Sequence, residues 1–240
     1  MKTIRKATAV ILLLLMFSAV GMAQLKLGVK AGMNVNNIHQ NYKENSLESE
    51  TRMLLAYHLG VMADYSLSDV LSIQPGLMYS RKGFSYNLKK ELEGESSLDG
   101  FDRTYFDYLE VPVNVAYKFG SMQVYAGPYI SAGLNGINKY DYSYKMDGIE
   151  EKEKDDYKIK PFFNKVGDKD ATDDKGEFSG LDYGVNVGLG FNRGPFMISA
   201  AFTNGFGNIT PNYKADSGLR DDFKVRNRGG NLSLTYFLGQ

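Results

Sequence analysis

The 240-residue chain contains no cysteine, and its only histidines are His39 and His58. Without cysteine it can form no disulfide bond and offers no thiolate nucleophile, thiolate metal ligand or lipoprotein attachment site. Two histidines leave little room for acid–base enzymes or histidine metal sites. An excess of positive charge is also lacking, because 28 Lys and Arg are balanced by 28 Asp and Glu. No basic patch indicates a nucleic-acid partner.

Only one long apolar run exists, between residues 9 and 20. Lys2, Arg5 and Lys6 precede it, and Gly21-Met22-Ala23 follows with small residues at the −3 and −1 positions of a cleavage site. This three-part pattern predicts a cleavable signal peptide over residues 1–23. A membrane anchor would need about 20 apolar residues. We therefore expect an exported mature domain over residues 24–240, with 25 Lys and Arg against 28 Asp and Glu.

Most of the remaining chain alternates apolar and polar residues with a period of two, which predicts β-strands rather than helices. Eight such stretches can be recognised: 25–36, 55–67, 71–79, 109–119, 124–134, 181–191, 196–202 and 232–238. Short turns at 66–69, 120–121 and 192–195 alternate with long connections at 37–53, 85–104, 136–178 and 207–224. The pattern predicts an all-β, eight-stranded antiparallel up-and-down transmembrane barrel with short periplasmic turns and long extracellular loops.

A soluble barrel is the alternative, and the polar face of the strands argues against it. That face is rich in Gly and Ser rather than in charge, as expected for the inside of a narrow barrel. Aromatic residues lie near the strand ends of the apolar face, as in the girdles of membrane barrels. They are Tyr57, Tyr65, Tyr79, Tyr117, Phe119, Phe191, Phe196, Phe202 and Tyr236. We therefore expect contact with outer-membrane lipid and insertion by the outer-membrane assembly machinery.

Three prolines conflict with a closed sheet, because each removes a hydrogen-bond donor. Pro75, Pro112 and Pro128 are therefore predicted to lie at bulges or strand ends.

Several segments resemble the outer-membrane β-barrel domain family of Bacteroidota, whose members are often called PorT-like. The matching segments are 71–83 (LSIQPGLMYSRKG), 108–112 (YLEVP), 125–129 (YAGPY) and 204–209 (NGFGNI). The resemblance spans essentially the whole mature chain and implies an eight-stranded barrel, of the OmpX or OmpA type, in a Gram-negative outer membrane. It implies no particular activity, because the shared motifs are strand and turn patterns.

Charged residues on the predicted inner face form the first candidate site: Lys26, Lys30, His58, Asp64, Lys82, Glu110, Lys118 and Asp182. A barrel of eight strands is filled by side chains, so a salt-bridged plug is expected there. The alternative is a proton or ion path, or a ligand site.

Two further candidates lie in the connections. His39 is close in sequence to Ser46 and Glu48, a weak indication of a hydrolase or acyltransferase at the outer rim. Asp168, Asp170, Asp173, Asp174 and Glu177 lack the regular spacing of a calcium loop, so a solvated acidic loop is favoured.

The sequence favours a structural or interaction role, in adhesion or in an envelope complex, with an extracellular or periplasmic protein partner. A narrow channel for small solutes is the second hypothesis, and a rim enzyme the third. We expect no cofactor, no bound metal and no catalytic activity.

Overall fold

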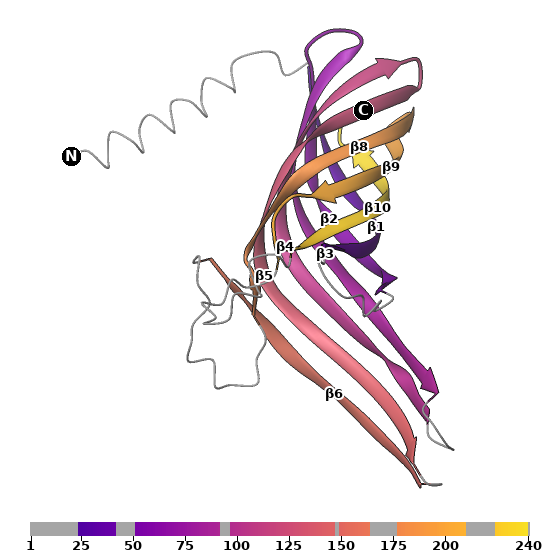
Figure 1. Cartoon of the computed structure of the whole chain (residues 1–240). Helices are drawn as coiled ribbons and strands as arrows, with labels where there is room; N and C mark the ends of the chain where they lie inside the picture. The colour runs from indigo at the N-terminus through magenta and orange to yellow at the C-terminus, as the bar shows by residue number, and fades with distance from the viewer. Residues whose placement is uncertain are drawn as a thin grey trace, which may run out of the picture.

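The computed structural model describes residues 24–41, 51–91, 97–146, 149–163, 177–209 and 224–239 (Figure 1). Ten strands are found: β1 (Leu25–Asn41), β2 (Thr51–Ser66), β3 (Leu71–Glu91), β4 (Ser97–Phe119), β5 (Met122–Met146), β6 (Ile149–Phe162), β7 (Glu177–Ser179), β8 (Leu181–Arg193), β9 (Phe196–Gly205) and β10 (Lys224–Phe237). Within these ranges no helix is long and apolar enough to cross a membrane.

Eight of these strands close into a ring. Each pairs antiparallel with its neighbour in the order β1, β2, β3, β4, β5, β8, β9, β10, and β10 pairs with β1. β1 pairs continuously with β10 on one side and with β2 on the other, so that Gly32 lies opposite both Ser233 of β10 and His58 of β2. The predicted eight-stranded barrel is therefore confirmed. A closed ring leaves none of its central strands with an unpaired edge.

Short turns join the strands at one end of the barrel. Gly120 and Gly194 have φ angles of 61° and 57°, which favour glycine because a Cβ atom is strained there. The start of β1 and the end of β10 lie at the same end, where Ser66 donates to the Gln24 carbonyl and Phe237 donates to the Pro195 carbonyl. The outer ends of β3, β4, β5 and β6 lie at the opposite end (Figure 1).

The two faces of the barrel wall have the reverse of a soluble protein's polarity. Large apolar side chains point outward, for example Val187 with 57% of its surface exposed and Leu59 with 54%. Polar side chains fill the inside, including fully buried Asp182 and Thr235. A continuous apolar exterior of this kind needs an apolar surrounding rather than water.

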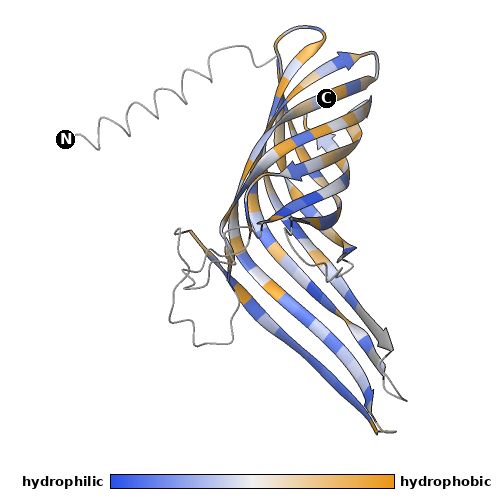
Figure 2. Cartoon of the chain, in the orientation of Figure 1, coloured by the Kyte–Doolittle hydropathy of each residue, from blue (hydrophilic) through white to orange (hydrophobic). Residues whose placement is uncertain are grey.

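The strands extend much farther beyond the barrel than the sequence predicts. The sequence predicts long connections over 85–104 and 136–178, yet β3 and β4 pair from 83–91 to 97–105 and β5 pairs with β6 from 136–146 to 149–159. We call these four paired segments the outer sheet; they project away from the barrel in Figure 1. Both of its faces are largely polar, as Figure 2 shows for β6, so apolar alternation cannot reveal its strands.

The prediction of bulges or strand ends at the three prolines is wrong. All three lie inside strands that keep their register: Pro75 is opposite Val113, Pro112 opposite Tyr129, and Pro128 opposite Val185. Each proline pairs with the strand on one side, and the ladder on its other side skips that position without a change of register, so the missing donor does not require an extra residue. Gly76 also leaves room for Pro112, whose Cγ atom would lie 3.2 Å from a Cβ at position 76.

Candidate functional site: a closed polar lumen

The lumen is closed near the short turns by a polar layer and an apolar layer. Lys118 forms an ion pair with Asp64 at 2.9 Å. The Gln74 side-chain amide donates to Asp64 at 3.3 Å and also contacts the buried Gln123. Met62, Met197 and Phe237 form a buried apolar cluster at the same end. Together these side chains form a polar and an apolar layer inside this end of the barrel.

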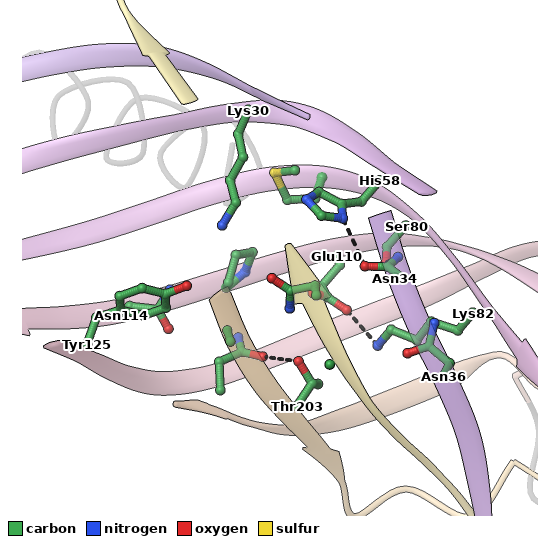
Figure 3. Close-up of a pocket in the computed structure, with 16 residues that line it drawn as sticks. Lys30, Asn34, Asn36, His58, Ser80, Lys82, Glu110, Asn114, Tyr125 and Thr203 are labelled. Atoms are coloured by element: carbon green, nitrogen blue, oxygen red, sulfur yellow. Dashed lines mark hydrogen bonds and ion pairs between the residues drawn. The ribbon is translucent and has the colours of Figure 1, made fainter. Parts of the chain in front are cut away.

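A buried ion network occupies the outer half of the lumen. The Lys82 ammonium lies 2.6 Å from Glu110 and 3.3 Å from Asp182, so two carboxylates on different strands share one cation. Asp182 also accepts hydrogen bonds from the Tyr129 hydroxyl at 3.2 Å and the Asn227 amide at 3.0 Å. Figure 3 shows Lys82 and Glu110 pointing toward one another. The two ion pairs therefore link β3, β4 and β8 across the lumen.

His58 is held on both sides by neutral polar groups. Its Nδ1 atom lies 2.8 Å from Oδ1 of Asn34, and its Nε2 atom lies 2.9 Å from Oγ of Ser233. Gly32 makes this position possible, because a Cβ there would lie 2.6 Å from the imidazole ring. The ring thus joins β1, β2 and β10, which is the seam where the barrel closes.

Lys30 differs from the other lumen cations. In the described part of the chain no carboxylate lies within ion-pair distance of Lys30, although Glu110 is its electrostatic neighbour. It points into a cavity of about 50 Å³ that is also lined by His58, Glu110 and Tyr125 (Figure 3). Among the described residues, the Asn36 amide nitrogen, the Asn114 side-chain carbonyl and the Tyr125 hydroxyl have no hydrogen-bond partner. A cavity of this size and polarity has room for a few water molecules.

An apolar plug closes the outer mouth. We define this outer plug by its buried members: Ile38, Phe106, Tyr108, Ile159, Phe178, Ile209 and Val225. Phe178 of β7 is 1% exposed and packs on Phe106, with ring centroids 4.6 Å apart. Gly133 receives its ring, because a Cβ there would lie 2.8 Å from Phe178. The plug therefore brings together residues from five strands and one connection.

Sequence reasoning missed the outer plug, because it treated residues 136–178 as one long loop. The only signals were isolated apolar residues in a charged segment, Ile159 and Phe178, with no periodicity to place them.

The other predicted site residues are distributed unevenly. Lys26 is exposed at the short-turn end of β1, opposite Asp64 in the register. The His39 side chain, Ser46, Glu48 and the acidic residues 168–174 lie outside the described residues, while Glu177 is half-buried in β7. Within the described ranges no group of three or more His, Asp or Glu side chains could hold a metal ion.

The aromatic residues predicted to form a girdle have exposed or half-buried side chains on the barrel wall. Tyr65 and Tyr79 are half-buried. The others are exposed: Tyr57, Tyr117, Phe119, Phe191, Phe196, Phe202 and Tyr236. Phe196 and Tyr236 pack together near the short turns, with ring centroids 5.2 Å apart.

Comparison with solved structures finds other outer-membrane barrels. The chain is 14% identical to Ail of Yersinia pestis, with a TM-score of 0.37 over 89% of this chain and 98% of that one. It is 11% identical to neisserial surface protein A, with a TM-score of 0.36 over 88% and 96% of the two chains. The protease OmpT of Escherichia coli is 10% identical, with a TM-score of 0.32 over 92% and 99%. No functional conclusion follows from likenesses this distant.

No curated protein sequence matches the chain significantly. A family model does match, over residues 21–211, and its description is outer membrane protein beta-barrel domain. The finer assignment to the PorT-like proteins of Bacteroidota stays a prediction. With the closed ring of eight strands and its apolar exterior, the match establishes that the chain belongs to the outer membrane protein beta-barrel domain family.

Proposed function

We propose that this protein is a non-conducting barrel whose task is to hold the outer sheet outside the cell, where the sheet contacts a partner. One observation carries the proposal: buried apolar clusters lie at both ends of the lumen, with ion pairs between them. A solute would have to displace a complete layer of packed side chains to pass. The barrel wall then serves as an anchor, and the outer sheet is the part left for interaction.

The outward aromatic girdle supports lipid as the surrounding medium, and such a barrel would be inserted by the outer-membrane assembly machinery. A catalytic role finds no support among the described residues, because His58 contacts neutral side chains and the acidic groups of the lumen are tied up in ion pairs. We therefore favour an interaction role over a channel or a rim enzyme.

Conductance across a planar lipid bilayer tests the proposal. The full chain, folded into the bilayer and verified by its heat-modifiable migration, should give no steady current steps, because both apolar clusters remain in place. A large porin inserted by the same procedure is the positive control. Reproducible steps from the folded chain would contradict the proposal and make the protein a channel.

A further inference from the structure

The two faces of the outer sheet differ in chemistry, because successive residues of a strand point to opposite sides. One face, which we call the acidic face, carries four carboxylates beside a row of tyrosines: Asp102 of β4, Tyr140, Tyr142 and Tyr144 of β5, and Glu151, Glu153 and Asp155 of β6. Over residues 98–106, 138–146 and 149–157, no Lys or Arg occupies this face. Over these ranges of β4, β5 and β6 the charges of the acidic face therefore have one sign, and the one basic register position on this face, Lys90 opposite Leu98, is on β3, the strand of the outer sheet farthest from β6.

The opposite, basic face is mixed and carries most of the cations. Its basic residues are Arg103, Lys139, Lys145, Lys152, Lys154 and Lys158, interspersed with Asp99, Asp141, Glu150 and Asp156. The cations find partners on their own face: Lys152 lies 3.2 Å from Glu150, and Lys154 lies 3.7 Å from Asp141. Among the described side chains, no Lys or Arg forms an ion pair with the carboxylates of the acidic face.

Ring stacking and hydrogen bonds hold the tyrosines and carboxylates of the acidic face beside one another. The Tyr140 and Tyr142 rings are stacked, with centroids 5.2 Å apart. Their hydroxyls donate to Glu153 at 3.3 Å and to Asp102 at 3.4 Å, and the Tyr144 hydroxyl donates to Glu151. Burial and the Asp102 carboxylate raise the pKa of Tyr142 to about 12, so the ring stays neutral. Neutral tyrosine rings beside carboxylates attract cations through both charge and ring electrostatics.

The same sheet ends in an open edge. Among the described strands, residues 149–158 of β6 pair with β5 on one side only, and all ten are exposed. An unpaired edge offers backbone donors and acceptors to another polypeptide. Antiparallel pairing of two β6 edges would put the carboxylates of both copies on one face, where they repel. The charge pattern therefore disfavours a second copy and favours a basic strand.

Building on the proposed function, we infer that the acidic face and the β6 edge bind an extended polypeptide segment with Lys or Arg at every second position. Glu151, Glu153 and Asp155 are spaced two residues apart, so alternate side chains of an added strand would stand opposite them. The tyrosine row lies beside these carboxylates on the sheet. A basic polysaccharide would match the charge but could not use the strand edge.

Fluorescence anisotropy of a labelled Lys-Thr repeat peptide tests this inference, with the full chain folded in zwitterionic vesicles. The chain should bind the repeat more tightly than a peptide of equal composition whose lysines form one block. Glu151→Gln/Glu153→Gln/Asp155→Asn should weaken binding about ten-fold, because each exposed ion pair changes a binding constant by roughly two-fold. Lys152→Gln/Lys154→Gln/Lys158→Gln is the matched control, with three charges removed from the same strand on the opposite face, and should not weaken it.

Equal losses in both triple variants, or no loss in the first, would overturn the inference. Equal binding of the block peptide, or of a chitosan oligomer with the same number of charges, would also overturn it by removing the need for strand pairing. These outcomes can be distinguished from a failure of the proposed function, because that function is contradicted only by steady current steps in the planar-bilayer experiment. Heat-modifiable migration of both variants verifies that the barrel, which contains none of the substituted residues, is folded.

Discussion

Replacing Lys82 by methionine should lower the free energy of unfolding by about 3–5 kcal/mol, since it leaves the fully buried Asp182 and the partly buried Glu110 without their shared cation. Lys82 lies between Glu110 and Asp182, and its ammonium is also 4.3 Å from the centre of the Tyr129 ring. Asp182 is fully buried, so water cannot replace the lost partner. Equilibrium unfolding in urea, from lipid vesicles, measures the change.

The control for Lys82→Met removes all the charges together. Lys82→Met combined with Glu110→Gln and Asp182→Asn should recover most of the lost stability, because the penalty comes from unpaired charges rather than from the missing ion pair. A loss below about 1 kcal/mol for Lys82→Met alone would indicate that water reaches the network, since only solvated ion pairs contribute so little. That result would also weaken the description of the lumen as closed.

The barrel could be predicted from the sequence because its wall has one apolar and one polar face. From Leu181 to Phe191, for example, apolar residues alternate with Gly, Asn and Asp. In the structure the apolar residues of this segment are exposed and the residues between them are buried. The lumen charges could be placed on the inner face by the same period. Their partners could not, because Lys82 and Asp182 are 100 residues apart and meet only through the ring closure.

The outer sheet and the outer plug could not be predicted, for opposite reasons. Both faces of the outer sheet are exposed to water, so its strands show no alternation of apolar residues. Cross-strand pairs such as Tyr144 with Glu151 determine its pairing instead. The outer plug depends on single apolar residues, such as Phe178 and Ile159, that come from separate segments. A single residue carries no periodic signal, and its burial is decided by the tertiary structure.

The outer sheet and the outer plug also explain why the alternation of apolar residues predicts that the barrel lies in lipid but does not predict its function. Lipid imposes one requirement on every outward residue of the wall, so the signal repeats along all eight strands. The lumen has no such uniform surrounding, and the water around the outer sheet accepts almost any polar residue on either face. In the lumen and the outer sheet, each residue is therefore determined only by the particular side chains it contacts. The buried ion network and the residues proposed to bind a partner are found there rather than on the outside of the barrel wall.

Introducing arginine in the middle of the proposed lipid face should impair folding into lipid by about 2–4 kcal/mol. Val187 of β8 is the best position, because it is 57% exposed and pairs with Ala126 and Phe202 on the barrel exterior. Val187→Arg would put a charge into hydrocarbon, whereas in a soluble barrel the same arginine would be solvated at almost no cost. Urea titration of folding into vesicles measures the difference.

Two controls separate the lipid effect from other damage. Val187→Leu keeps an apolar side chain at the same position and should fold like the natural chain. Asn186→Ser changes the neighbouring inward residue, which accepts a hydrogen bond from Thr203 at 2.9 Å, so it should cost only about 1 kcal/mol. If Val187→Arg is tolerated as well as Val187→Leu, the outward face does not contact lipid. In that case the apolar exterior must be covered by protein, and the anchoring role assigned to the barrel would have to be abandoned.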